Sequence, residues 1–331
     1  MINRFADRLF KRRWTPERIQ KYLGEVRSAW LAYAQDEEIR GNAASGGTIT
    51  AVLAHLLESR QIDGALVLTS TVTGNEVKAE YRIATTREEL VQAQGSKYFE
   101  TNFTHDAVPL IQDFNGRLAL TLLPCDTWVV NRLMRNNLEI AQKIALRIAL
   151  FCGHISDPGL TRLVIRKAKK PGLSLVHFRN RIGHWRGKLQ FGFEDGSQTQ
   201  KPFSAFSDYQ NLYFFCARKC LRCHDHAGYD SDLAVGDIWL MAMKNNPIKH
   251  NAVLARTEIA EKFLQSAFQA GALNLQSVPV EMVADGQARS LPLHYNVSAR
   301  AKAARLFGLP LTEPVKERVR LVDYLVALVI L

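Results

Sequence analysis

Five cysteines are the residues of this chain best suited to chemistry, and they fall into two groups. Cys125 and Cys152 each follow an apolar run that is typical of a buried strand. The other three are spaced Cys-x3-Cys-x2-Cys: Cys216, Cys220 and Cys223. Closely spaced cysteines in a reducing compartment are more often metal ligands than disulfide partners. Sets of four thiolates suit zinc or an iron–sulfur cluster.

The cysteine spacing by itself leaves four interpretations open. Radical-SAM enzymes use the same triplet, but there it precedes a long half-barrel, and only 108 residues follow Cys223. A zinc site would combine cysteines with His224 or His226. An iron–sulfur cluster would join the two strand ends with the triplet loop. The fourth interpretation is a group of buried thiols that bind nothing, as many cysteines do.

Two glycine-containing turns could bind a phosphate group. Residues 44–48, ASGGT, lie directly before a predicted helix. Paired glycines let backbone N–H groups approach an anion, and a helix N-terminus adds partial positive charge. Residues 95–98, GSKY, offer an ammonium group for phosphate and an aromatic ring for stacking. Neither turn has the spacing of a known nucleotide fingerprint, so each is also compatible with an ordinary loop.

Two further features carry less information. Acidic residues bracket the predicted strand at 232–239, which capped strand ends would explain. His154 lies close to Cys152, where it could donate a proton or simply be a polar loop residue. The sequence identifies no catalytic residue.

The elements that must position these residues alternate between strand and helix through the first half of the chain. Apolar periodicity predicts helices at 15–35, 49–57, 85–94, 126–136, 157–167, 258–269, 298–307 and 317–331. It predicts strands at 64–69, 77–83, 117–123, 144–151, 173–178, 185–193, 232–239, 252–256 and 277–282. This order indicates an α/β fold: a mixed, largely parallel sheet core with an antiparallel hairpin insertion and helical N- and C-terminal segments.

Composition and charge exclude several classes of protein. The chain has 331 residues, of which 47% are apolar and 23% charged, so it can bury a full core. Five cysteines are too sparse for a disulfide scaffold. No apolar run reaches the roughly 18 residues that span a bilayer. Residues 1–14 carry four arginines and a lysine without an apolar region, which argues against a secretory signal. A cytoplasmic location is therefore expected.

The net charge of +11 is compatible with an acidic protein partner, with nucleic acid or with a merely solvated surface. Basic residues are scattered, with local clusters at 8–13, 162–170 and 179–188. We find no helix-turn-helix or RNA-binding signature, so an acidic protein is a better candidate partner than nucleic acid.

Seven short motifs in this order resemble those of the coenzyme F420 hydrogenase/dehydrogenase beta-subunit family. They lie at residues 44–48, 64–68, 95–98, 123–126, 149–153, 220–225 and 232–239. The resemblance implies a mixed α/β core that holds FAD and a [4Fe–4S] cluster side by side. It also implies an oxidoreductase that passes electrons between a carrier, such as ferredoxin or a hydrogenase-type donor, and a small-molecule substrate. That substrate would be a deazaflavin or another conjugated compound.

The same resemblance implies roles for individual residues. The cluster ligands would be Cys125, Cys152, Cys220 and Cys223, which leaves Cys216 as an extra cysteine. The flavin contacts would fall on both glycine turns: Ser45, Gly46, Gly47, Thr48, Ser96, Lys97 and Tyr98.

The resemblance also suggests how the chain is divided. Residues 1–39 would form an N-terminal helical segment and 40–170 an α/β flavin-binding part. Residues 171–290 would form a C-terminal α/β part with the cysteine motif, and 291–331 the C-terminal helices. Many family members also carry a cysteine-rich, ferredoxin-like segment at the N-terminus.

Because the first cysteine here is Cys125, we expect a short member that lacks that segment and takes electrons from a separate protein. A basic surface suits an acidic ferredoxin, since complementary charge speeds association. The resemblance leaves room for an oligomer.

Two alternatives to a redox enzyme remain at this stage. One is a non-enzymatic zinc-binding interaction module, in which Cys216, Cys220, Cys223 and a histidine hold one ion. The other is a degenerate family member associated with polysaccharide biosynthesis.

Overall fold

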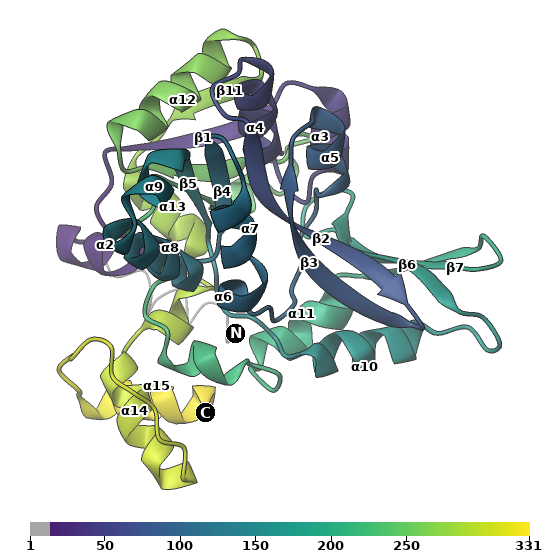
Figure 1. Ribbon diagram of the computed structural model, residues 1–331. Coiled ribbons are helices and arrows are strands. Elements are labelled where there is room, and N and C mark those ends of the chain that lie inside the picture. Colours follow the sequence, from purple (N-terminus) through teal and green to yellow (C-terminus); the bar gives the residue numbers. More distant parts are fainter. Residues whose placement is uncertain (1–13) are drawn as a thin grey trace.

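The computed structural model describes residues 14–331, which fold around one large mixed sheet (Figure 1). The basic cluster at 8–13 and nearly all of the segment 1–14 lie outside the described residues. The proposed division of the chain at residues 39, 170 and 290 stays a proposal. None of the helices in the described part is long and apolar enough to cross a membrane.

The central sheet has eight strands in the order β11-β1-β10-β9-β5-β4-β2-β3. Neighbouring strands run parallel from β9 through β5 and β4 to β2, and the pairings on either side are antiparallel. The strands are β1 (Ser28–Ala34), β2 (Gly64–Thr73), β3 (Glu76–Ala84), β4 (Leu118–Leu122), β5 (Ile144–Leu150), β9 (Leu233–Asp237), β10 (Asn251–Ala255) and β11 (Leu273–Ser277). The four parallel strands therefore bring their carboxyl ends to one edge.

A second, antiparallel sheet extends away from the central one (Figure 1). It consists of β6 (Leu175–Ile182), β7 (Lys188–Phe193) and β8 (Gln198–Pro202). Together the two sheets confirm the predicted fold class, with a mixed core, an antiparallel insertion and helices at both ends. The sequence analysis missed β8 because its residues, QTQKP, are mostly exposed and show no apolar alternation.

Helices cover both faces of the central sheet. They are α2 (Pro16–Leu23), α3 (Glu37–Asn42), α4 (Thr48–Glu58), α5 (Arg87–Gln92), α6 (Phe103–Asp106), α7 (Val108–Asp113), α8 (Pro124–Asn136), α9 (Leu138–Lys143), α10 (Pro158–Ala168), α11 (Ser204–Asn211), α12 (Glu258–Gln269), α13 (Val280–Gln287), α14 (Val297–Ala304) and α15 (Leu321–Ile330). Short 3-10 turns include η1 (Arg218–Arg222) and η3 (Leu291–His294).

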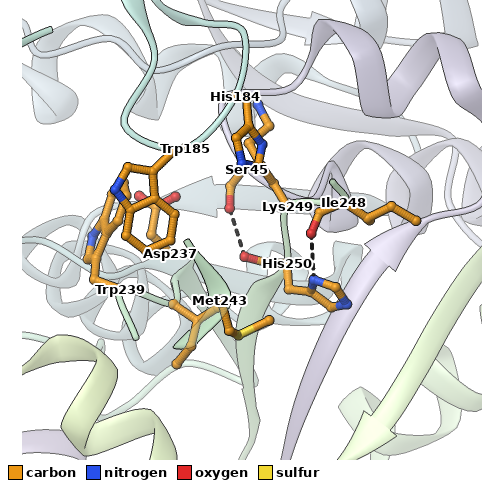
Figure 2. Close-up of a pocket in the computed structure, with 10 residues that line it drawn as sticks. Ser45, His184, Trp185, Asp237, Trp239, Met243, Ile248, Lys249 and His250 are labelled. Carbon is orange, nitrogen blue, oxygen red and sulfur yellow. Dashed lines mark hydrogen bonds between the residues drawn. The ribbon is translucent and has the colours of Figure 1, made fainter. Parts of the chain in front are cut away.

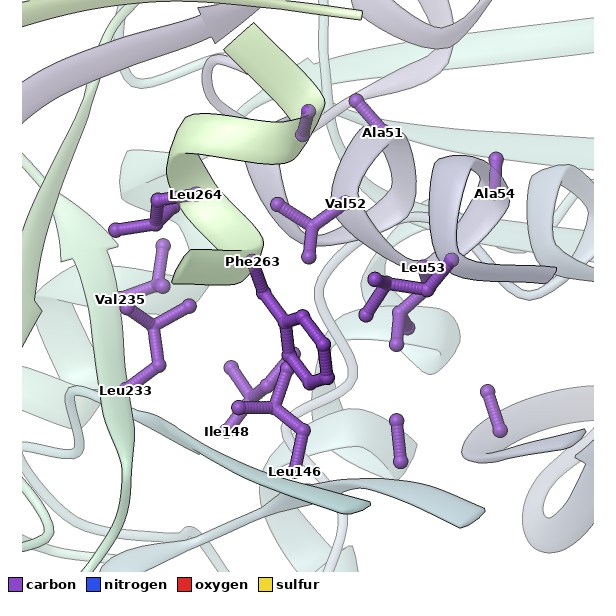
Figure 3. Packing of buried hydrophobic residues seen from close by; sticks show 14 of the residues in the cluster. Ala51, Val52, Leu53, Ala54, Leu146, Ile148, Leu233, Val235, Phe263 and Leu264 are labelled. Carbon is purple, nitrogen blue, oxygen red and sulfur yellow. The ribbon is translucent and has the colours of Figure 1, made fainter. Parts of the chain in front are cut away.

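The main hydrophobic core lies between α4, α12 and one face of the sheet (Figure 3). Val52 and Leu53 of α4 meet Phe263 and Leu264 of α12 above the side chains of β5 and β9. Alternation along the strands sends the neighbouring side chains to the opposite face. There α2, α13 and the helices α6–α9 cover the sheet. Burial on both faces holds the parallel strand ends rigidly in place.

The helix predicted at 15–35 is wrong in its second half. α2 ends at Leu23, and Gly24 caps it at φ 72°, where a Cβ atom would lie 2.9 Å from the ring of Tyr229. The residues that follow form β1, whose two neighbours in the sheet are distant in sequence. Residues 29, 30 and 33 keep helical spacing, but β1 carries apolar side chains on both faces of the sheet and shows no clear apolar–polar alternation.

The strand predicted at 277–282 is also wrong. β11 ends at Ser277, and α13 begins at Val280 after Pro279. The apolar run there is too short for its periodicity to distinguish a strand from a helix.

Candidate functional site

The carboxyl edge of the parallel strands gathers the residues singled out by the sequence. Cys125 follows β4 and opens α8, Cys152 follows β5, and Asp237 ends β9. Because β4, β5 and β9 are consecutive parallel neighbours, these residues lie along one edge. Ligands commonly bind at this edge in open α/β sheets.

Backbone hydrogen bonds fix each cysteine locally. The Cys152 N–H donates to the carbonyl of His226 at 2.9 Å, which ties the strand end to the triplet loop. In that loop the η1 turn brings Cys220 and Cys223 together, and the Cys223 N–H donates to the Cys220 carbonyl at 2.9 Å. The Ile155 N–H points at the Cys220 sulfur at 3.4 Å.

Four thiols from three separate parts of the chain are near neighbours. All five cysteines are free thiols. Burial raises the pKa of the Cys152 thiol, and the thiols of Cys220, Cys125 and Cys223 raise it further. Burial and the neighbouring charges likewise raise the pKa of Cys125, and the pKa of Cys223 rises to about 12. A buried group of this kind ionises only when a cation is present to stabilise the thiolates.

Cys216 lies beside this group and contacts Cys220. A hydrogen bond from the Cys216 thiol lowers the pKa of Cys220, and the N–H of Ile155 lowers it as well. The structure therefore brings all four predicted cluster ligands together and places the extra cysteine next to one of them.

The four thiols do not close around one point. Among residues 14–331, no three His, Cys, Asp or Glu side chains have the spacing that a single metal ion needs. A [4Fe–4S] cluster has less stringent needs, because each thiolate binds a different iron atom. His226, one histidine available to a zinc site, uses both ring nitrogens, on the Cys152 carbonyl at 3.2 Å and on Gln287 at 3.1 Å.

A buried cation adjoins the thiols. Arg300 of α14 donates from Nε to the Leu221 carbonyl at 2.6 Å and from Nη2 to the Cys223 carbonyl at 2.7 Å. Its Nη1 atom has no hydrogen-bond partner in the described part of the chain. A buried guanidinium with a free N–H near the thiols of Cys223 and Cys216 fits an anionic, thiolate-ligated group.

The first glycine turn is explained in large part by packing. A Cβ atom on Gly46 would lie 2.6 Å from the Ala32 carbonyl oxygen, and Gly47 has φ 79°. Ser45 donates from Oγ to the His250 carbonyl at 2.9 Å (Figure 2). Thr48 is fully buried, and its Oγ1 atom has no partner among the described residues. The N-cap residue of α4, Gly47, has no side chain to cap the helix, and the Thr48 N–H donates to Asn251 Oδ1 at 3.3 Å.

The second glycine turn is held by its own lysine. Lys97 donates from Nζ to the carbonyls of Ala93, Gln94 (3.0 Å) and Gly95 (3.2 Å). Burial lowers the pKa of Lys97 to about 7, and the charge of Arg179 contributes.

The rest of that turn packs against the second sheet and α11. The Ser96 carbonyl accepts a hydrogen bond from Asn180 at 3.3 Å. The Tyr98 ring packs on Phe203 and Phe206.

Three cations that the sequence analysis did not assign lie around the two turns. Arg179 of β6 donates to the carbonyl of Asn42, just before the first turn, and Arg181 donates to the carbonyl of Ala44, the first residue of that turn. Lys249 donates to the carbonyls of Ala43 at 2.7 Å and Gly183 at 2.8 Å. We call Lys97, Arg179, Arg181 and Lys249 the cation cluster. The basic run at 179–188 was a usable signal, but in sequence it indicated only surface charge.

One carboxylate lies within the cation cluster. Asp237 forms a two-pronged ion pair with Arg181, at 2.5 and 2.9 Å. Burial lowers the pKa of Lys249 to about 8, and the charge of Arg181 adds to this effect. Four basic groups around one acid leave an excess of positive charge, which suits a phosphate ligand.

The cavity beside Ser45 is small. Trp185 and Trp239 meet edge to face at 5.5 Å on one side of it, and Lys249 and His250 lie on the other (Figure 2). Its volume of about 20 Å³ corresponds to roughly one water molecule.

A larger hollow of about 270 Å³ lies next to the cysteine triplet. Trp128 of α8 and His224 border it, with ring centroids 4.9 Å apart, together with Arg135 and Tyr229.

Side-chain hydrogen bonds connect the cysteines to the cation cluster. Gln287 of α13 donates to the Asp237 carbonyl and meets His226 at 3.1 Å. His226 in turn meets the Cys152 carbonyl at 3.2 Å. Burial lowers the pKa of His226 to about 4, so the ring is neutral and donates its one N–H to one of two acceptors, the Cys152 carbonyl or the Gln287 Oε1 atom. The two halves of the site are therefore held in a fixed relation.

Two family models match this chain, and both describe the beta subunit of coenzyme F420 hydrogenase/dehydrogenase. Residues 29–105 match the model of its N-terminal part. Residues 115–281 match the model of its C-terminal part. Since both parts are present, the expectation of a shortened member is not supported.

Individual proteins agree with the family models. The chain is 26% identical over 301 residues to the coenzyme F420 hydrogenase subunit beta of Methanothermobacter thermautotrophicus, covering 87% of this chain and 98% of the relative. The subunit beta of Methanosarcina barkeri is 23% identical over 269 residues, covering 80% of this chain and 86% of the relative.

A solved structure shares the fold. A chain of the F420-reducing [NiFe] hydrogenase complex from Methanosarcina barkeri, studied with xenon derivatization, superposes with a TM-score of 0.64 at 18% identity. The match covers 88% of this chain and 98% of that one.

Proposed function

Because the chain belongs to the coenzyme F420 hydrogenase/dehydrogenase beta-subunit family, we propose that it is a flavin- and [4Fe–4S]-dependent oxidoreductase. It would pass electrons between a protein carrier and a deazaflavin or another conjugated small molecule. One observation carries this proposal: four free thiols from three separate segments, one buried and three half-buried, lie together at the carboxyl edge of the parallel strands.

In this proposal Cys125, Cys152, Cys220 and Cys223 hold the cluster. The raised pKa values of Cys125, Cys152 and Cys223 mean that these three thiols need a strongly bound cationic core to become thiolates. Leu293, Val326 and Ile330 from the C-terminal part of the chain pack over the cysteines. This cover would keep water from the cluster, and water access is one determinant of its potential.

The two glycine turns and the cation cluster would hold the FAD pyrophosphate. Backbone N–H groups at the start of α4 and the positive charges of Lys97, Arg179, Arg181 and Lys249 support this assignment. A cavity of about 20 Å³ is too small for a flavin, so FAD binding would have to open this region.

When bound, the cluster would supply single electrons and the flavin would pair them for hydride transfer. The protein's part is positioning. The Gln287 and His226 side chains hold the end of β9 against the end of β5, which keeps the two sites at a constant separation.

The electron donor would be ferredoxin or a hydrogenase-type subunit. Arg218 and Arg222 of the η1 turn are exposed beside Cys220 and Cys223, and they would attract an acidic surface. The names of the relatives and the hydrogenase complex of the structural neighbour support a deazaflavin substrate and partner subunits.

Anaerobic purification tests the proposal directly. We expect about four irons and one FAD per chain and a broad absorption band near roughly 400 nm, as for thiolate-bound clusters. Iron, zinc and flavin would be measured on the same sample. Zinc without iron or flavin would overturn the enzyme assignment and favour a zinc-binding interaction module. Iron and flavin that no carrier reduces would favour a degenerate member.

A further inference from the structure

The most deeply buried arginine near the cysteines is Arg300, which lies outside both segments matched by the family models. Its side chain is the largest of the fully buried ones among residues 14–331, with 1% of its surface exposed. Two of its nitrogens hold the carbonyls of Leu221 and Cys223. The α14 helix therefore fastens the cysteine triplet loop through a guanidinium group.

The charge of Arg300 has no carboxylate partner of its own in the part of the chain that the structure describes. Its Nη1 atom has no hydrogen-bond partner there either. Glu317 is within electrostatic range, but it pairs with Lys21 at 2.6 Å and accepts the Val297 N–H at 2.7 Å. Burying a charge without a counter-charge is costly, so a protein that keeps one there needs an anion nearby.

The nearest groups that can supply negative charge are thiols. The thiols of Cys223 and Cys216 both stabilise the charged form of Arg300. Four thiolates around an iron–sulfur core carry a net negative charge, which increases by one when the cluster is reduced. A fixed positive charge therefore favours the reduced form more than the oxidised form.

We propose that Arg300 is a positioning residue that offsets the charge of the cysteine-bound cluster and raises its reduction potential. This inference rests on the proposed function, since it requires the cluster. It assigns a role in setting the potential to the C-terminal segment, which none of the cysteine motifs includes. The carbonyl contacts give Arg300 a second effect, because they hold the loop that carries Cys220 and Cys223.

Three variants test the effect of the Arg300 charge on the reduction potential of the cluster. Arg300→Gln removes it and keeps an amide donor, while Arg300→Lys keeps it. Arg305→Gln is the matched control, because it removes an exposed arginine just beyond the same helix, 72% exposed and 3.9 Å from Glu313. The readouts are iron content and the midpoint potential of the cluster. Electron paramagnetic resonance during a reductive titration measures the midpoint potential.

We expect the equilibrium constant for one-electron reduction to fall at least tenfold in Arg300→Gln, a shift of about 59 mV to lower potential. The potentials of Arg300→Lys and Arg305→Gln should stay close to that of the unmodified protein. If Arg300→Gln does not fold, Arg300→Met, which also removes the charge, is measured in its place against the same Arg305→Gln control.

Two outcomes would overturn the inference alone. One is an iron-loaded Arg300→Gln variant with the potential of the Arg305→Gln control. The other is a shift in Arg300→Lys that is as large as the shift expected for the glutamine variant. Unmodified protein without iron would instead overturn the proposed function, and the inference would fall with it.

Discussion

Single residues decide what this site can bind. The cysteine triplet is a local motif, and its spacing was visible in the sequence. The roles of Arg181 and Lys249 were not visible, because each donates to a backbone carbonyl at the start of the first glycine turn, far away along the chain. The role of a charged side chain in a binding site can be inferred only when its neighbours in the folded protein are known.

The thiols at the strand ends and in the loop should be individually required. We expect Cys125→Ala and Cys220→Ala to lose the absorption band near roughly 400 nm and nearly all bound iron, since each removes one of four thiolates. Cys216→Ala should keep both, because it removes only a neighbour of Cys220. Iron analysis and a visible spectrum after anaerobic purification check this prediction. An unchanged spectrum in either ligand variant would contradict the assignment.

FAD affinity should depend on pH through Lys249. The pKa of this lysine is lowered to about 8, so its positive charge is present below that pH and is lost as the pH rises above it. We therefore expect FAD to dissociate more readily at pH 9 than at pH 7. Fluorescence titration of the flavin-free protein with FAD would measure the effect.

Two lysine variants provide controls for that titration. In Lys249→Met, FAD should bind more weakly at pH 7 and with a smaller pH dependence. Lys244→Met changes an exposed lysine nearby and should behave like the unmodified protein. Equal affinity and equal pH dependence in all three proteins would argue against a role for Lys249.

At the scale of elements, close backbone packing shapes the glycine turn before α4. Gly46 lies against β1 and β10, where a Cβ atom would be 2.6 Å from the Ala32 carbonyl oxygen and 2.9 Å from the Asn251 nitrogen. Both neighbours are backbone atoms of the central sheet, which cannot move easily. The sequence suggested a phosphate contact, whereas the structure adds a packing reason for the same glycine.

Gly46→Ala should destabilise the fold. We expect a loss of about 1–3 kcal/mol, which is typical of overpacking in a rigid interior. Gly41→Ala is the matched control: Gly41 lies in α3 with nothing within 4 Å of its added Cβ atom, so alanine should stabilise by about 0.5–1 kcal/mol. Urea unfolding followed by circular dichroism measures both changes. Equal stability of the two variants would refute the packing argument.

Sequence patterns predict some helices and strands correctly and fail for others. Helices with a polar face and a capping residue, such as α10 after Asp157 and α12 after Thr257, agree with the prediction. The stretch that became β1 did not, since this strand packs against hydrophobic clusters on both faces and so lacks the apolar–polar alternation that identifies strands.

At the scale of the whole molecule, the net charge of +11 should govern association with an electron carrier. We expect the rate of reduction by an acidic ferredoxin to fall as salt rises from about 0.05 to about 0.5 M, because ions screen charge attraction. Stopped-flow absorbance at several salt concentrations would follow it. A rate that does not depend on salt would reject electrostatic docking.

A pair of charge reversals locates the docking surface. Arg222 lies beside Cys220 and Cys223. The Arg222→Glu substitution should slow reduction of the protein by ferredoxin and weaken the dependence of that rate on salt. Arg60→Glu changes an exposed arginine just before β2, at the opposite edge of the parallel strands, and should have little effect. Equal rates in the two variants would place docking elsewhere.

The sequence by itself determined the class of fold and the cysteine motif. Seven motifs in a fixed order also indicated the protein family. These features are local or periodic, so they depend on residues close together along the chain. Only the tertiary structure decided which residues meet: Cys125 and Cys152 with the triplet, β6 with both glycine turns, and Arg300 with the cysteine loop. Each of these contacts joins segments tens of residues apart, and folding alone brings such segments together.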